Sequence, residues 1–298
     1  MTKIPGTSLL VKPPVWFITG CSTGFGHELA KQCIAQGHRT VITARDPSQL
    51  QGYASDDSLV LPLDVTKPDQ VAAAIAATYA RFGEIDVLVN NAGIGYFAAI
   101  EESEEIEVRK MFDVNVFGLG RMIHAALPGM RARRRGVIVN FSSIGGLRSF
   151  PALGYYNATK YAVEGLSEAL WQEVEPLGIR VMLVEPSGFR TDWAGRSANE
   201  SKKHIDDYAG TAGQARAQLR AISGRQAGDP VRAARAVFDA VTSGKAPHHL
   251  LLGNDAFEGA MAKLDELRIE FSAGETVARG ADFPIATAQQ KPILTQVE

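Results

Sequence analysis

Tyr156 and Lys160, four residues apart, have the types and spacing needed to move a proton. The pattern of residues 156–174 predicts a helix, and this spacing puts both side chains on one face of it. A free tyrosine has a pKa of about 10, and an ammonium one turn away is expected to lower it. Such a tyrosine gives a proton to a carbonyl oxygen or takes one from an alcohol. Tyr155 is adjacent, but only Tyr156 has a lysine four residues later.

Further polar residues precede that helix. Ser142 and Ser143 each carry a hydroxyl that could hold the substrate oxygen and stabilise the charge developing on it, and chemistry alone does not choose between them. Asn115 lies within the helical pattern of residues 103–127. Taken alone, it is interpreted as an amide that satisfies a backbone group.

Three glycines, Gly20, Gly24 and Gly26, follow an apolar run at residues 15–19. Gly20 permits a tight turn, Gly24 lets the backbone approach a pyrophosphate, and Gly26 lets the next helix pack closely. The N-terminus of that helix offers free N–H groups to phosphates. A glycine-rich turn without a ligand is the alternative, but its position after the first strand of an alternating chain favours a dinucleotide site.

Short apolar runs and longer amphipathic stretches must position these residues. Strands are expected at 15–19, 40–43, 59–63, 86–90, 137–141, 180–184 and 250–252, and helices at 28–36, 68–82, 103–127 and 156–174. The alternation predicts an α/β fold, a Rossmann-type, doubly wound parallel sheet of about seven strands in a single domain, with helices on both faces. The expected parts are an N-terminal extension at 1–14, the domain at 15–271 and a surface tail at 272–298.

The bulk properties argue against several functions. The chain has 298 residues and a net charge of −2, so we expect no nucleic-acid partner and no attraction to anionic lipid. No apolar run approaches the roughly 20 residues of a membrane helix, and residues 1–14 lack the apolar core of a secretory signal. With only Cys21 and Cys33, and no Cys/His cluster, we expect neither disulfide nor metal, and a cytoplasmic location.

The spacing T-G-x-x-x-G-x-G at residues 19–26 resembles the opening of the short-chain dehydrogenase/reductase family, in its short single-domain branch. The resemblance covers about residues 15–252. It continues through N-N-A-G at 90–93, Asn115, Ser143 thirteen residues before the tyrosine, Y-x-x-x-K at 156–160 and a proline-glycine segment at 186–191. The thirteen-residue spacing favours Ser143 over Ser142.

The resemblance implies an oxidoreductase that uses a nicotinamide dinucleotide. Ser143, Tyr156, Lys160 and Asn115 would be catalytic; Lys160 would also bind the nicotinamide ribose, and Asn115 would hold a water linking Lys160 to solvent. Asp64 would bind the adenine amino group, although a strand-end turn is its alternative role. Asn90 would line the adenosine ribose, and Thr191 would hold the carboxamide. The full set of implied cofactor residues is Gly20, Ser22, Thr23, Gly24, Phe25, Gly26, Arg45, Asp64, Val65, Asn90, Ala92, Gly93, Tyr156, Lys160, Pro186, Phe189 and Thr191.

The end of the second strand bears on which nicotinamide is bound. The family's NAD-binding acid would fall at Ala44, which cannot accept a ribose hydroxyl. Arg45 follows and could hold a 2′-phosphate, so we predict that NADP(H) is preferred, with NAD(H) possible. Asp46 is the competing acid, and its alternative role is to cap the helix at Pro47.

Candidate residues of the substrate-binding site are aromatic or small and lie beyond the ends of the strands. Phe97, Gly145, Phe150, Tyr155 and Trp193 are candidate walls, and they suit an apolar ketone or secondary alcohol. Residues 195–224 are polar, show no clear strand, and are expected to form a lid. Ser187 replaces the glycine that the family has after the proline, which predicts either a local change in the loop or a serine facing the nicotinamide.

The expected reaction is that of a carbonyl reductase or alcohol dehydrogenase. Rival readings are a non-catalytic dinucleotide-binding redox sensor and an epimerase or dehydratase of the longer branch, which has a different glycine spacing. By resemblance, copies would pair through the tyrosine helix and the next long helix as a homodimer or homotetramer, with Trp171 a plausible contact.

Overall fold

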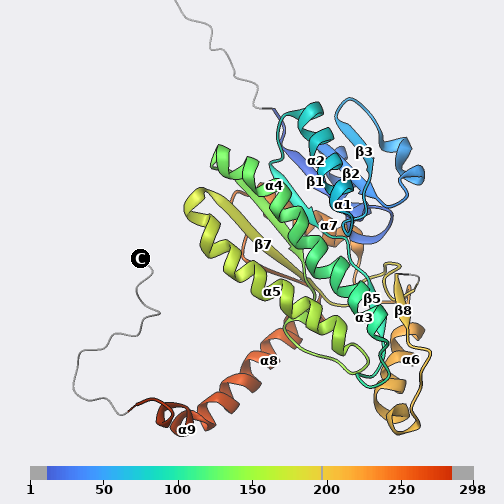
Figure 1. The fold of residues 1–298 in the computed structure, drawn as a ribbon, viewed down its shortest axis with the longest axis vertical. Helices are drawn as coiled ribbons and strands as arrows, with labels where there is room; N and C mark the ends of the chain where they lie inside the picture. Colours follow the sequence, from blue (N-terminus) through green and yellow to red (C-terminus); the bar gives the residue numbers. More distant parts are fainter. Residues whose placement is uncertain (1–11, 196, 284–298) are drawn as a thin grey trace, which may run out of the picture.

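A seven-stranded parallel sheet lies at the centre of the structure, a computed structural model that describes residues 12–195 and 197–283 (Figure 1). The strand order is β3-β2-β1-β4-β6-β7-β9, so the order reverses between β1 and β4, and the predicted doubly wound sheet is confirmed. The strands are β1 (Val15–Ile18), β2 (Arg39–Ala44), β3 (Ser58–Pro62), β4 (Val87–Asn90), β6 (Gly136–Phe141), β7 (Ile179–Pro186) and β9 (His249–Leu252).

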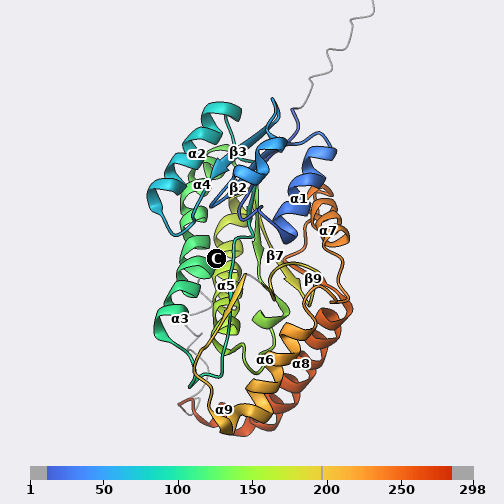
Figure 2. The ribbon, with the colours of Figure 1, turned by 90° about the vertical axis from the view of Figure 1, so that its right-hand side faces the viewer.

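Helices cover both faces of this sheet (Figure 2). Successive strand residues point to opposite faces, so in β1 the side chain of Phe17 packs toward α2, α4 and α5, whereas that of Trp16 packs toward α1 and α7. Both faces are therefore buried, which explains why the strands are apolar without alternation. The helices are α1 (Gly24–Ala35), α2 (Pro68–Phe82), α4 (Leu119–Arg133), α5 (Gly154–Val174) and α7 (Pro230–Thr242).

The helix expected at residues 103–127 begins at 105 and ends at 133, and it changes type in the middle. It consists of α3 (Glu105–Phe112), a π-helical segment (Asp113–Gly118) and α4. Asn115 lies in the π-helical segment and is buried. Such segments are frequent at functional sites.

Residues 195–224 differ from the strand-free loop that was expected. They contain β8 (Ala198–Glu200), which pairs in parallel with β5 (Gly95–Phe97), and then α6 (Gln214–Ala221). Short 3₁₀ and π turns occupy Asp206–Tyr208 and Ala209–Gly213. A three-residue polar strand has no periodicity of its own, and only its partner 100 residues away reveals it.

The C-terminal region is also more regular than the expected tail at 272–298. Helix α8 (Asn254–Ala273) runs past the predicted boundary at 271, and α9 (Glu275–Gly280) follows; both extend away from the sheet (Figure 1). Most of the predicted extension at 1–14 and the end of the tail lie outside the described residues. Within the described ranges, no helix has the length and apolar character needed to cross a bilayer.

Candidate active site

The glycine loop between β1 and α1 is held by backbone contacts. Gly20 has a φ of +71°, which favours glycine, and a Cβ on Gly26 would lie 2.6 Å from the Gly20 carbonyl oxygen. Asn91 Nδ2 donates to the carbonyl oxygens of Thr19 and Gly20, both at 2.9 Å. Thr19 Oγ1 in turn accepts from the N–H of Asn91 and of Ala92, both at 3.0 Å. The predicted tight turn and close helix packing are confirmed.

The N-terminus of α1 is open toward this loop. Thr23 stands at the N-cap without making a side-chain cap hydrogen bond, and no acidic residue lies in the first turn. Ser22 is exposed, while Thr23 and Gly24 are half-buried. The first N–H groups of α1 therefore lack a protein acceptor of this kind, and a dinucleotide phosphate fits the position.

Aromatic and polar residues after β7 lie over the same loop. The Phe25 ring centre is 5.5 Å from that of Phe141 and 5.0 Å from that of Phe189. A Cβ on Gly24 would lie 3.4 Å from the Thr191 side chain, so Thr191 closes over the glycine loop. Pro186 ends β7 just before this segment. Predicted cofactor residues of the glycine loop therefore contact predicted cofactor residues of the segment after β7.

Tyr156 and Lys160 are buried on the same face of α5. Lys160 Nζ lies 5.7 Å from the centre of the Tyr156 ring and donates to the carbonyl oxygen of Phe141 at 2.7 Å. Ser143 Oγ accepts from the N–H of Gly145 at 3.0 Å. Asn115 Oδ1 accepts from the N–H of Ile94, and its Nδ2 donates to the Ile94 carbonyl, both at 2.9 Å. Asn115 Nδ2 also donates to Thr159 Oγ1 at 3.1 Å, on α5 beside Lys160.

Burial dominates the electrostatics of this pair. It raises the pKa of Tyr156 to about 12, with hydrogen bonding from Ser143 acting in the opposite direction. It also lowers the pKa of Lys160 to about 8, although Glu164 raises it in part. The expectation that Lys160 lowers the tyrosine pKa is therefore wrong for this structure. The reason is that desolvation opposes the charged form of both groups.

An aromatic cluster covers Tyr156. The Trp193 ring centre lies 4.8 Å from that of Tyr156 and 5.5 Å from that of Phe97, and Tyr155 packs at the edge of the same cluster. Phe150 is 37% exposed at the rim, and a Cβ on Gly145 would lie 3.4 Å from the Tyr156 ring. Four of the five predicted substrate residues, Phe97, Gly145, Tyr155 and Trp193, therefore lie around or near the tyrosine, and the place of Phe150 in the substrate site stays a prediction.

Comparison with known proteins identifies the family. The model of the short chain dehydrogenases matches residues 14–202. The chain belongs to the short-chain dehydrogenase family. It is 36% identical to the oxidoreductase BOA17 of Botryotinia fuckeliana, over 83% of this chain and 91% of that protein. It is 42% identical to a 3-ketodihydrosphingosine reductase of Bacteroides thetaiotaomicron, over 67% of this chain and 73% of that protein.

Solved short-chain dehydrogenases have the same fold. A Streptomyces avermitilis short-chain dehydrogenase superposes with a TM-score of 0.83 at 41% identity, covering 90% of this chain and all of that one. Two more distant structures contain nicotinamide nucleotides. They are a Thermococcus sibiricus alcohol dehydrogenase with 5-hydroxy-NADP (TM-score 0.67, 26% identity, 81% of this chain and 96% of that one) and a Brucella melitensis 3-ketoacyl-(acyl-carrier-protein) reductase with NADH (0.68, 28%, 80% and 96%). This short-chain dehydrogenase is an oxidoreductase, and a nicotinamide dinucleotide is its cofactor.

Arg45 and Asp46 follow the end of β2. Arg45 is exposed, after the buried Ala44. Asp46 Oδ1 accepts from the N–H of Ser48 at 3.0 Å, and this bond holds the pKa of Asp46 below its usual value. Asp46 thus contacts the first residue of the 3₁₀ turn Ser48–Tyr53, whose N-cap position is occupied by Pro47. The contacts of Arg45 and Asp46 with a ribose substituent stay predictions.

Two predicted adenosine residues make contacts within the protein. Asp64 Oδ1 accepts from the N–H and the hydroxyl of Thr66, at 2.9 and 2.8 Å, as a turn acid does. Asn90 Nδ2 donates to Asn140 Oδ1 at 2.9 Å, and Asn90 Oδ1 is buried without a partner among the described residues. Val65 is buried, and Gly93 lies against Asn115. The predicted adenine and ribose contacts of Asp64 and Asn90 stay predictions.

Ser187 does not strain the loop after β7. Its φ is not positive, its N–H donates to the Leu252 carbonyl at 3.0 Å, and its Oγ lies against Gly253. The serine therefore joins β7 to the start of α8, and the glycine with a positive φ is Gly253, at +94°. The Ser187 hydroxyl also donates to the Leu252 carbonyl at 3.4 Å.

Sequence reasoning missed two contributors. Asn91 lies inside the N-N-A-G motif, so its signal was present in the sequence. Arg220 stacks 4.8 Å from the centre of the Phe97 ring, and that contact depends on chain packing that no local pattern shows. Gly95, in the stretch 95–97 expected to line the substrate site, leaves room for the Trp193 ring, since a Cβ there would lie 2.9 Å from it.

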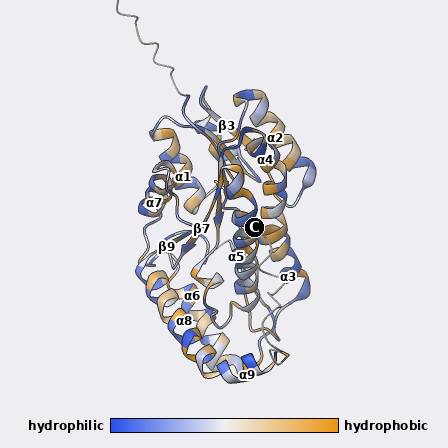
Figure 3. Cartoon of the chain, turned by 90° about the vertical axis from the view of Figure 1, so that its left-hand side faces the viewer, coloured by the Kyte–Doolittle hydropathy of each residue, from blue (hydrophilic) through white to orange (hydrophobic). Residues whose placement is uncertain are grey.

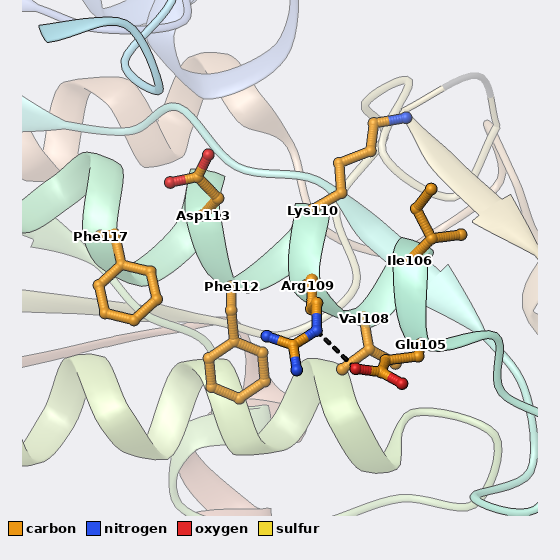
Figure 4. Close-up of a pocket in the computed structure, with 8 residues that line it drawn as sticks. All are labelled: Glu105, Ile106, Val108, Arg109, Lys110, Phe112, Asp113 and Phe117. Atoms are coloured by element: carbon orange, nitrogen blue, oxygen red, sulfur yellow. Dashed lines mark hydrogen bonds and ion pairs between the residues drawn. The ribbon is translucent and has the colours of Figure 1, made fainter.

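A surface hollow lies apart from these residues. It has a volume of about 730 Å³ and follows α3 and the π-helical segment beside α5 (Figure 4). None of the predicted catalytic residues lines it. Its lining consists of Glu105, Ile106, Val108, Arg109, Lys110, Phe112, Asp113 and Phe117.

Proposed function

We propose that this protein is an NADP(H)-preferring carbonyl reductase or secondary alcohol dehydrogenase acting on an apolar substrate. The observation that carries the proposal is the buried group at the carboxyl edge of the sheet. There Tyr156 interacts with Ser143, has Lys160 one turn away, and packs under Trp193. Parallel sheets bind ligands at this edge, and the glycine loop opens onto it.

Each residue has a defined task in the proposed reaction. A nicotinamide held by the glycine loop and the segment after β7 would supply the hydride chemistry at the substrate carbon. In reduction the Tyr156 hydroxyl gives its proton to the carbonyl oxygen, and in oxidation the phenolate takes the proton back. The Ser143 hydroxyl donates to the same oxygen and stabilises the charge that develops there. Lys160 supplies positive charge near the phenolate, and Asn115 holds the π-helical segment against α5.

The cofactor would be held mainly by backbone groups. The N-terminus of α1 and the glycine loop would bind the pyrophosphate, and the segment after β7 would bind the nicotinamide. Arg45 supports the preference for NADP(H), because it is a guanidinium at the strand end where the family's NAD-binding acid is absent. The residues proposed to line this site are Gly20, Ser22, Thr23, Gly24, Phe25, Gly26, Arg45, Asp64, Val65, Asn90, Ala92, Gly93, Pro186, Phe189 and Thr191.

The substrate would lie under the segment that follows β7. Trp193, Phe97 and Tyr155 offer apolar surface around the reactive tyrosine, which favours an apolar ketone or alcohol. Residues 195–224 are the proposed lid, since β8 pairs with β5 directly beside Phe97. The similarity to a 3-ketodihydrosphingosine reductase is in keeping with a ketone substrate.

Pairing of copies is proposed on the face formed by α3, the π-helical segment and α5. Large apolar side chains are exposed there, and a second copy would cover them. These side chains are Ile106, Phe117, Tyr161 and Leu166.

The test is turnover, followed at 340 nm, on a panel of ketones and alcohols with both cofactors. Tyr156→Phe is expected to lower kcat about 1,000-fold while nucleotide binding is kept, because only the transferable proton is removed. Tyr155→Phe, its matched control, should stay within about threefold of the unmodified enzyme. Tight NADPH binding without turnover on the whole panel would instead identify a redox sensor.

A further inference from the structure

A cluster of ionisable side chains lies near Lys160. Glu164 follows Lys160 by one turn of α5, Glu185 lies near the end of β7, and His249 begins β9. Polar atoms of Glu164, Glu185 and His249 all lie within 4.8 Å of one another. His249 Nδ1 and Glu185 Oε1 are 2.6 Å apart. Three elements distant in sequence therefore bring two carboxyl groups and an imidazole together.

The two carboxyl groups are poorly compensated by hydrogen bonds. Glu185 is fully buried, and Glu164 is half-buried. The Ser142 hydroxyl donates to Glu164 Oε1, but the Oε2 atoms of both glutamates are buried without a partner among the described residues. The pKa of Glu164 is raised to about 7, mainly by burial and also by the nearby Glu185, although the Ser142 bond and the charges of His249 and Lys160 lower it in part. Burial also raises the pKa of Glu185, so both carboxyl groups favour the protonated form more than free glutamates do.

The charges facing this cluster come from three elements. Lys160 and Glu164 belong to α5, Glu185 to β7 and His249 to β9, and with all four ionised the charges cancel. The cluster has the atom types of a zinc site, but the Lys160 ammonium is a cation that already interacts with Glu164. Gain or loss of a proton can balance the charges of Glu164, Glu185 and His249 without a metal ion.

The cluster extends from the buried lysine to the surface. Lys160 is 7% exposed, whereas the His249 side chain is 49% exposed. Trp171 fixes the outer end, with its ring centre 5.5 Å from that of His249 and 4.2 Å from that of His248. His248 pairs with Glu175 at 3.2 Å. Trp171 thus makes contacts within the chain, and its part in a subunit contact stays a prediction.

We propose that Glu164, Glu185 and His249 form a proton-exchange site that connects Lys160 to solvent and sets its charge. The proposal rests on the proposed function, in which Lys160 is the cation beside the reacting tyrosine. His249 exchanges a proton with solvent and with Glu185, whose Oε1 lies 2.6 Å from His249 Nδ1. Glu164 lies within 4.8 Å of these groups, so a bridging water would carry the proton on to Glu164, which interacts electrostatically with the Lys160 amine. Each transfer breaks one bond to hydrogen and forms one, so no oxidant or reductant is needed. This exit is separate from the one expected through Asn115.

The first test measures Lys160 itself and needs no turnover. Burial lowers the pKa of Lys160 and Glu164 raises it, so Glu164→Gln should lower the midpoint of the Lys160 titration by about one pH unit. The midpoint is read from carbon-13 NMR of labelled lysine side chains, with Lys160→Arg to assign the signal. Glu168→Gln, an exposed substitution one turn further along α5, is the matched control and should not move it.

An unchanged midpoint in a folded Glu164→Gln protein would overturn the proposal. If that protein does not fold, Glu185→Gln replaces it and should move the midpoint in the same direction by a smaller amount. The second test is His249→Asn, which should lower kcat and increase its solvent deuterium isotope effect while KM stays unchanged. An unaltered isotope effect would contradict the relay. If the unmodified protein reduces no carbonyl, the proposed function fails, and the NMR titration still decides about the cluster.

Discussion

The glycine loop and the segment at residues 189–221 face the same edge of the sheet, but different contacts hold them. In the loop, backbone atoms of Thr19 and Gly20 meet Asn91 and leave no room for a Cβ at Gly26. In the later segment, side chains make the contacts, and their partners come from residues about 100 positions earlier in the chain.

Glu102 is the centre of the second arrangement. It is 2% exposed and accepts from the N–H of Ile205 at 2.8 Å, from the N–H of Ala99 at 3.1 Å, and from Arg216 at 3.1 Å. Arg216 also pairs with Glu200 at 3.0 Å. A loop that is held by backbone contacts therefore tolerates few residue types. A segment that is held by side-chain pairs depends instead on both members of each pair.

Adding a methyl group inside the glycine loop should have the largest effect. Gly26→Ala places a Cβ against Asn91 and the Gly20 carbonyl, which should cost about 3 kcal/mol of stability and weaken NADPH binding about 100-fold. Gly52→Ala is the control, because Gly52 has free space and an ordinary φ, and it should gain about 0.5 kcal/mol. Urea unfolding and fluorescence titration with NADPH measure both. Equal NADPH affinity in the two variants would contradict the claim that the loop leaves no room for a Cβ at Gly26.

Removing Glu102 should loosen residues 195–224, because Ile205 and Arg216 bind to its carboxyl group. Glu102→Ala leaves the Arg216 charge buried without this partner and is expected to cost about 3 kcal/mol of the free energy of unfolding. Glu101→Ala, beside it, removes only the exposed contact to the Tyr208 hydroxyl and should change stability by less than about 0.5 kcal/mol. Denaturation gives the energies, and limited proteolysis shows where cleavage begins. Similar cleavage of residues 195–224 in both variants would disprove the anchoring role.

Truncation of Trp193 should have a smaller effect on stability. Trp193→Ala removes the half-buried ring between Tyr156 and Phe97, which should cost about 2 kcal/mol and open the site to bulkier ketones. Trp193→Phe keeps an aromatic ring and should restore most of the stability. Unfolding curves and relative kcat/KM on small and bulky ketones provide the measurements. An unchanged substrate ranking in Trp193→Ala would place the substrate elsewhere.

Replacing Arg45 should change the cofactor preference and have little effect on stability, because its side chain is exposed. Arg45→Ala should reduce the ratio of kcat/KM for NADPH to that for NADH about tenfold, since an exposed charged contact to the 2′-phosphate is lost. Arg235→Ala removes another exposed guanidinium, on α7, and should leave the ratio unchanged. A ratio that already favours NADH in the unmodified enzyme would refute the preference.

Acid should weaken the Glu102 contacts, with the smallest expected change. Burial alone would raise the pKa of Glu102, but the N–H groups of Ile205 and Ala99 and the Arg216 charge outweigh it, so the pKa is lowered. A lowered folded-state pKa stabilises the protein above the unfolded value, near 4.3, and this stability is lost as pH falls through the folded pKa. The intrinsic exchange rate of an amide falls between pH 7 and 3, so the measured quantity is the protection factor of the Ile205 N–H, the ratio of the intrinsic to the observed rate. This protection factor should decrease as the pH falls, and Glu102→Gln should abolish the decrease.

The outcome at particular residues shows how far prediction from sequence reached. The sheet, the position of the glycine loop and the pairing of Tyr156 with Lys160 were predictable, because strand patterns and spacing on a helix are local properties. It was not predictable that burial affects the Tyr156 pKa more than the nearby lysine does. Tyr156 packs against Trp193, which lies 37 positions later in the chain. Likewise β8 has no periodicity, and it becomes a strand only because β5 pairs with it.

The sequence by itself determined the elements, their alternation and the residues with reactive groups, because side-chain type and local spacing control helices, strands and tight turns. Only the tertiary structure decided which of those groups meet. It buried Tyr156 beneath an aromatic cluster, joined Ser187 to Gly253, and brought Glu164, Glu185 and His249 together near Lys160. Contacts of this kind depend on how the whole chain packs, and burial then sets the charges of the groups that it encloses.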